Sequence, residues 1–72
     1  MMPSIQMQRM LREQLTASPL KSGEIRRIEG MGELYVSTTK EMENAHEYTF
    51  MYSLYIDEIP YYFFSKLNGD QA

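Results

Sequence analysis

The 72-residue chain predicts a small α+β fold, with one N-terminal amphipathic helix packed on an antiparallel sheet of about four strands in a meander. Three observations lead to this prediction. Apolar residues recur at helical spacing near the N-terminus, alternate with period two in later segments, and are interrupted by short turn sequences. The length suits a single domain over 1–72, in which we expect residues 1–3 and 69–72 to fray.

The helix is predicted over about residues 4–16. Pro3 and Ser4 suit a helix start, because proline's fixed φ fits the first turn and a serine hydroxyl can cap free N–H groups. Pro19 ends the segment, because a residue before proline disfavours the helical conformation. The apolar side chains on one face of this helix are Met7, Met10, Leu11 and Leu15. We expect all four to pack on the sheet, with the two methionines filling gaps in the core.

A first hairpin is predicted over residues 24–39. The segment 24–29 alternates weakly and leads into Glu29-Gly30-Met31-Gly32, where two glycines allow the positive φ angles of a turn. Strand-forming residues follow over 33–39. Alternation places Leu34, Val36 and Thr38 on one face of this strand and Tyr35 and Ser37 on the other.

A second hairpin is predicted between His46 and Leu67, with Asp57-Glu58 as its two-residue turn. Aromatic and aliphatic pairs across the two strands would stabilise this sheet. The expected pairs are Ile56 with Ile59, Leu54 with Tyr61, and Tyr52 with Phe63. Asp-Glu is not the favoured chemistry of such a turn, where a glycine is usual at the second position.

A short helix over 58–67 competes with the second strand of this hairpin. Ile59, Phe63 and Leu67 are four residues apart, and Asn68-Gly69 would suit a helix C-terminus. The run of aromatic residues in this segment favours the strand.

The chain carries no recognisable catalytic or metal-binding set. It has no cysteine and one histidine, His46, so it offers no disulfide, thiolate site or imidazole cluster. Ser53 and Ser65 are the serines nearest to His46, and neither lies in a nucleophile motif. The run 41–44 lacks the glycine and spacing of a calcium loop, and 30–32 lacks a third glycine for dinucleotide binding. We therefore expect a protein that is not an enzyme and uses no cofactor.

Charge divides the chain into two unlike halves. Residues 1–27 hold five basic and two acidic side chains, a net charge of +3, whereas residues 28–72 hold two basic and eight acidic ones, a net charge of −6. The acidic half suits a basic partner surface. Binding of nucleic acid through Arg9, Arg12, Arg26 and Arg27 is a weaker alternative, because these cations are few and scattered.

The aromatic residues exceed what so small a core needs. Eight of the nine lie between residues 48 and 64. Alternation predicts that Phe50, Tyr52, Tyr61 and Phe63 share one face of the hairpin, and that Tyr55, Tyr62 and Phe64 share the other. The second set would stand partly exposed, and exposed aromatics are typical of binding surfaces. The predicted partner-binding residues are Tyr55, Tyr62, Phe64, Glu43, Glu47, Asp57 and Glu58.

These features favour a non-enzymatic protein-binding module, of the kind found among small phage or mobile-element inhibitors, that occupies a basic surface of a larger partner. The alternative is a structural or regulatory homodimer that buries the surplus aromatics against a second copy. No segment has the roughly 20 consecutive apolar residues of a membrane span. We expect a cytoplasmic protein without a membrane partner.

Overall fold

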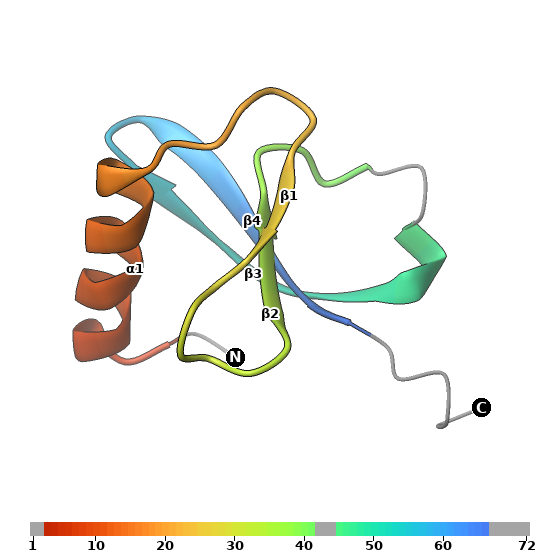
Figure 1. Ribbon diagram of the computed structural model, residues 1–72, viewed down its shortest axis with the longest axis horizontal. Coiled ribbons are helices and arrows are strands. Elements are labelled where there is room, and N and C mark those ends of the chain that lie inside the picture. Colours follow the sequence, from red (N-terminus) through yellow and green to blue (C-terminus); the bar gives the residue numbers. More distant parts are fainter. Residues whose placement is uncertain (1–2, 42–44, 67–72) are drawn as a thin grey trace.

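The computed structural model describes residues 3–41 and 45–66 of the chain. It contains one helix packed on a four-stranded antiparallel sheet, so the predicted α+β class is confirmed (Figure 1). The elements in chain order are α1 (Ile5–Ala17), β1 (Ile25–Arg27), β2 (Leu34–Ser37), the 3-10 turn η1 (Ala45–Glu47), β3 (Tyr48–Ile56) and β4 (Ile59–Lys66). No helix in this part of the chain is long and apolar enough to cross a membrane.

The strand order is β1-β2-β4-β3, which differs from the predicted meander. In a meander each strand pairs with the next in sequence, but here β2 pairs with β4 and leaves β3 at the sheet edge. Burial explains this order. Neighbouring residues Phe63 and Phe64 point to opposite faces of β4 and are both almost fully buried. A strand that is covered on both faces is best placed in the interior of the sheet.

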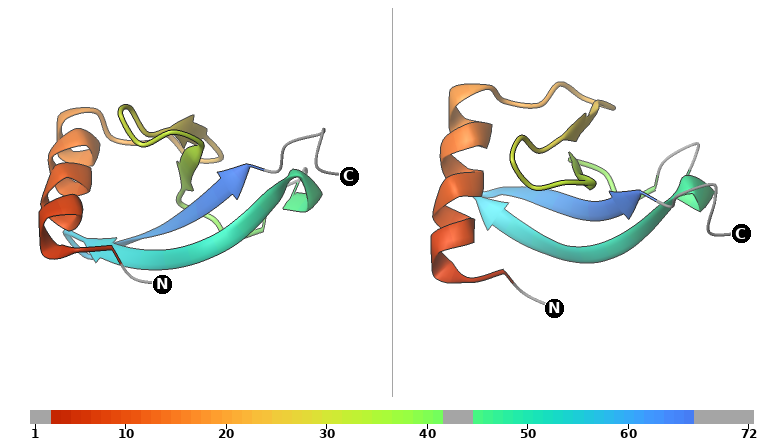
Figure 2. Two further views of the ribbon diagram at one scale, coloured as in Figure 1. Left: turned by 90° about the horizontal axis from the view of Figure 1, so that it is seen from below. Right: turned by 60° about the horizontal axis from the view of Figure 1, so that its bottom comes forward.

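Helix α1 begins and ends close to the predicted positions. The Ser4 hydroxyl accepts a hydrogen bond from the Met7 N–H at 3.2 Å, which caps the first turn. Leu11 and Leu15 are its only described side chains that are fully buried. The prediction that Met7 and Met10 fill the core was wrong, because they remain 37% and 43% exposed. Figure 2 shows α1 at one end of the sheet, and Leu11 and Leu15 are the α1 side chains that belong to the buried core.

The first hairpin follows the prediction. Arg26 pairs with Val36 across β1 and β2, and the Ile28 N–H donates to the Leu34 carbonyl at 2.8 Å. Gly30 and Gly32 in the turn have φ angles of 78° and 62°, which glycine adopts without steric cost.

The second hairpin has the predicted turn and the predicted pairs. Ile56 pairs with Ile59, Leu54 with Tyr61, and Tyr52 with Phe63. The competing helix over 58–67 is wrong for the residues described, because they form β4 as far as Lys66. Cross-strand packing of aromatic and aliphatic side chains outweighs the helical spacing of three apolar residues.

The turn of this hairpin is strained at both central residues. Asp57 and Glu58 have φ angles of 52° and 69°, in the left-handed region that non-glycine residues adopt at a cost of roughly 1–2 kcal/mol each. Two positive φ angles give the twist that suits a two-residue connection. The turn therefore forms because the cross-strand pairs of β3 and β4 next to it stabilise it.

Glu58→Gly is expected to raise the free energy of unfolding by about 0.5–1 kcal/mol, because glycine adopts the positive φ without strain. Urea unfolding followed by circular dichroism would measure the change. Glu58→Ala is the matched control, since it removes the same carboxylate but keeps the Cβ atom. An equal gain in both variants would show that charge, and not backbone strain, limits this turn.

The hydrophobic core lies between α1 and one face of the sheet. Its buried residues are Leu11, Leu15, Ile28, Val36, Tyr52, Ile56, Tyr61 and Phe63. Burial raises the pKa of the Tyr52 hydroxyl above its ordinary value. We call this side of the sheet the helix face.

Candidate functional site

A β-bulge in β3 rearranges the aromatic residues. Phe50 pairs with Phe64, but Tyr52 pairs with Phe63, so Met51 is an extra residue on the β3 side. One extra residue reverses the alternation of everything upstream of it. The prediction that Phe50 shares a face with Tyr52 and Phe63 was therefore wrong, and Phe50 lies on the opposite face with Phe64.

Five aromatic side chains from three strands meet on the side of the sheet opposite to α1. We call this set the aromatic face, and its members are Tyr35, Tyr48, Phe50, Tyr62 and Phe64. The ring centroids are 5.4 Å apart for Tyr35 and Tyr48, and 5.8 Å apart for Phe50 and Phe64. Tyr48 lies 6.2 Å from Phe64 and Phe50 lies 6.4 Å from Tyr62. These distances are typical of favourable aromatic contacts, and all of these pairs except Phe50 with Tyr62 are edge to face.

Exposure differs strongly across the aromatic face. Phe64 is only 3% exposed, because its neighbours surround it, whereas Phe50 is 40% exposed. Tyr35, Tyr48 and Tyr62 are partly buried. Helix α1 packs on the other side of the sheet, and no described helix covers the aromatic face. The result is a preassembled aromatic surface that is partly open to solvent.

Two lysines border the aromatic face. The Lys40 Nζ lies 4.4 Å from the centroid of the Phe50 ring, and the Lys66 Nζ lies 6.0 Å from that of Tyr35. Both distances are within the range of cation–π attraction. Neither lysine forms an ion pair with another described residue. Reasoning from the sequence missed both, because they lie outside the aromatic segment and only the fold brings them to it.

The structure brings together some of the predicted partner-binding residues and separates others. Tyr62 and Phe64 belong to the aromatic face. Tyr55 is 73% exposed and points to the same side of the sheet, since it follows Ser53, the partner of Tyr62. Its ring has no described aromatic contact.

The predicted acidic residues do not form one surface. Asp57 and Glu58 lie at the turn after β3, whereas Glu47 lies just before the same strand begins. Asp57 is also engaged by Arg12 at 3.2 Å. Glu43 lies outside the described residues.

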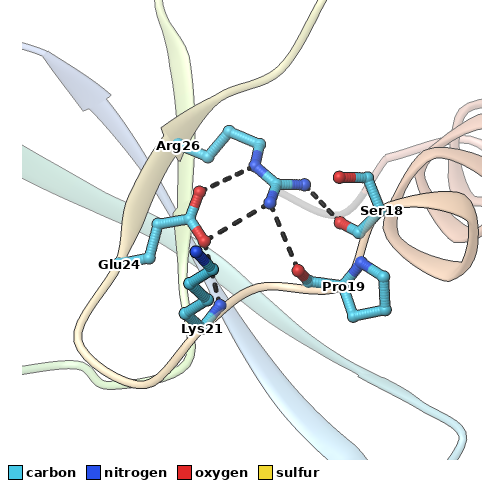
Figure 3. Close-up of polar contacts among 5 residues, drawn as sticks. All are labelled: Ser18, Pro19, Lys21, Glu24 and Arg26. Atoms are coloured by element: carbon cyan, nitrogen blue, oxygen red, sulfur yellow. Dashed lines mark hydrogen bonds and ion pairs between the residues drawn. The ribbon is translucent and has the colours of Figure 1, made fainter.

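Arg26 is occupied in joining the end of α1 to β1. Figure 3 shows its guanidinium donating to both Glu24 carboxylate oxygens and to the carbonyls of Ser18 and Pro19. The Lys21 N–H donates to Glu24 at 2.9 Å. This N–H donor, together with Arg26, lowers the pKa of the Glu24 carboxyl. The network organises the α1–β1 connection and leaves Arg26 few donors for a partner.

Two of the other three arginines are engaged by acidic residues. Arg12 is paired with Asp57, and Arg27 lies 3.9 Å from Glu33 and donates to the Gly32 carbonyl. Arg9 has no ion pair with a described residue.

His46 is exposed in η1, with its Nε2 atom 4.0 Å from a Glu47 carboxylate oxygen. No hydrogen bond connects it to Ser53 or Ser65 among the described residues. Within residues 3–41 and 45–66, no group of three acidic or histidine side chains is placed to hold a metal ion.

A second feature is an apolar hollow of about 390 Å³ beside the first turn of α1. Met7, Met31 and Met51 line it, together with Leu34 and Tyr52. The bulge places Met51 there, and the turn of the first hairpin places Met31 there. Met7 and Met51 are both partly exposed there, and methionine adapts to differently shaped apolar surfaces.

No protein family, curated protein or solved structure matches this chain. The function proposed for the aromatic face therefore depends on its geometry and chemistry.

Proposed function

We propose that this protein is a non-enzymatic protein-binding module that recognises its partner through the aromatic face. The observation that carries the proposal is a packed group of five aromatic side chains on the side of the sheet away from α1. Aromatic side chains bury a large area at low entropic cost and dominate the energetics of many protein interfaces. Because the rings already contact one another, little conformational entropy would be lost when a partner covers them.

The charges beside the aromatic face favour an acidic partner segment. Lys40 and Lys66 are the basic groups in contact with its rings, and Asp57 and Glu58 lie away at the hairpin turn. Glu33 accepts a hydrogen bond from the Tyr35 hydroxyl at 3.3 Å, but its charge is offset by Arg27 at 3.9 Å. The expected ligand is a segment with an apolar or aromatic anchor flanked by Asp or Glu. An inhibitor that covers a basic surface is the narrower form of this hypothesis, and the charges at this face do not favour it.

Binding of single-stranded nucleic acid is less well supported. Base stacking needs open ring faces in a groove that tracks the phosphate backbone with positive charge. Here the rings contact one another edge to face, and three of the four N-terminal arginines pair with acidic residues.

A photo-crosslinking amino acid at Tyr62 tests the proposal in cells that express the chain. We expect a crosslinked species of defined mass at Tyr62 and none at Thr16, an exposed residue of α1. The purified partner should then bind Tyr62→Ser at least about tenfold more weakly, as expected when a contact worth 1.4 kcal/mol is lost. Lys40→Gln should weaken binding mainly at low salt.

Equal crosslinking from Tyr62 and Thr16 would contradict the proposal, because it would indicate non-specific contact. Unchanged affinity in Tyr62→Ser, with the fold retained by circular dichroism, would contradict it as well.

A further inference from the structure

The two edges of the sheet are protected to different degrees. One edge, β1, has only three residues, and two of them are arginines. The other edge, β3, has nine residues, Tyr48–Ile56, with no charged residue and no proline. Natural proteins usually shield exposed edges with charge, proline or short length, because unpaired N–H and C=O groups recruit another strand. In β3 the only such protection is the bulge at Met51.

Alternate residues of β3 direct their backbone groups away from β4. In a hairpin with a two-residue turn, Ile56 and Ile59 exchange backbone hydrogen bonds. The backbone N–H and C=O groups of Tyr55 and Ser53 therefore point away from β4. Pro60, opposite Tyr55, has no N–H to donate, which agrees with this register. At the other end of the hairpin the Lys66 N–H donates to the Glu33 carbonyl, on the β2 side of β4. Tyr48, which pairs with Lys66, therefore also directs its backbone N–H and C=O groups away from β4.

We propose that a second copy of this chain pairs with β3 in an antiparallel manner about a two-fold axis, which joins two sheets into one of eight strands. An uncharged strand can pair with its own copy without burying an unpaired charge, and a two-fold axis is the commonest symmetry of homodimers. This inference depends on the outer edge of β3, with which no strand of residues 3–41 and 45–66 pairs, and not on the proposed function of the aromatic face.

Charge at the ends of β3 supports a second copy of this chain as the partner that pairs with this edge. A hollow lined by Ile5, Arg9, Arg12, Leu54 and Tyr55 lies beside the C-terminal end of the strand. Antiparallel pairing brings the N-terminal end of the partner strand, preceded by Glu47, to this hollow. Arg12 already neutralises Asp57 there, so Arg9 is the cation left to receive the incoming carboxylate.

The dimer would place two aromatic faces side by side on one continuous sheet. Tyr55, exposed in the single chain, would lie near the seam between the copies and become covered. A partner with two acidic aromatic segments would then bind both faces and gain affinity from their linkage.

Light scattering and sedimentation across the micromolar range test the dimer. We expect twice the mass of one chain for the wild type. Ser53→Lys should be a monomer, because Ser53 lies near the middle of β3 and the two-fold axis would bring the new charge close to the same charge on the second copy. Thr16→Lys on α1 is the matched control and should remain dimeric. Tyr62→Ser, on the aromatic face but away from the edge, should remain dimeric too, which separates this proposal from the proposed function.

Hydrogen exchange of the wild type gives a measurement that does not depend on any variant folding. The amides of Ser53 and Tyr55 should become protected as the dimer forms. A wild type that stays monomeric at high micromolar concentration would overturn the proposal. A dimer in which these amides exchange as in the monomer, or a folded Ser53→Lys variant that still dimerises, would also overturn it.

Discussion

Phe63→Ala is expected to lower the free energy of unfolding by about 3–5 kcal/mol, as large aromatic deletions in a core do. Phe63 has no exposed surface and lies on β4, between Val36 of one neighbouring strand and Tyr52 of the other. Its ring centroid is 5.2 Å from that of Tyr52. Domains of this size have a total stability of only about 5 kcal/mol, so the variant should keep roughly 0–2 kcal/mol and be unfolded to between a few per cent and about half at 25 °C.

Phe50→Ala is the matched control, because it removes the same phenyl group from the other side of the sheet. Since Phe50 is 40% exposed, the loss should be smaller than that for Phe63→Ala, roughly three fifths of it if the loss scales with buried apolar area. Urea unfolding of both variants, followed by circular dichroism, gives the comparison. Equal losses would mean that the aromatic face behaves as a second closed core, which would remove the basis for a partner at that face.

The second hairpin shows how much of the fold can be read from the sequence. Alternation on both sides of a two-residue turn determines each cross-strand pair, so three pairs were predicted correctly. The same reasoning failed upstream of Met51. A bulge formed without glycine or proline leaves no mark in the sequence pattern, so alternation placed Phe50 on the wrong face.

The candidate site was only partly predictable for a related reason. The aromatic surplus is visible in the composition, and alternation places Tyr62 and Phe64 on the same side of the sheet, as the structure does. The two lysines beside them come from the segment after β2 and from the end of β4. Their approach depends on β2 pairing with β4 and on the bulge turning Phe50. The alternation of apolar residues encodes neither the strand pairing nor the bulge.

Helix α1 is a similar case, because helical spacing identifies a face but not how much of it is covered. Four apolar residues share that face, and the structure buries only Leu11 and Leu15. The helix stands at one end of the sheet (Figure 2), and only its stripe with Leu11 and Leu15 belongs to the buried core. Met7 and Met10 therefore remain partly exposed.

Leu11→Ala is expected to lower the free energy of unfolding by about 2–5 kcal/mol, because it leaves a cavity at a site with no exposed surface. For a domain of this size that corresponds to a fall in melting temperature of more than about 10 °C. The helix attaches to the sheet through few other groups. The exposed Arg12–Asp57 ion pair contributes at most about 1 kcal/mol, so little would compensate for the lost leucine.

Met10→Ala is the control for Leu11→Ala, because the two residues are adjacent on α1 and differ mainly in burial. Alanine favours helix formation at both positions, so propensity changes in the same direction in each. The Met10→Ala melting temperature should stay within a few degrees of the wild type. A similarly small shift in Leu11→Ala would show that the sheet is stable without α1, and the helix face would then become a second candidate binding surface.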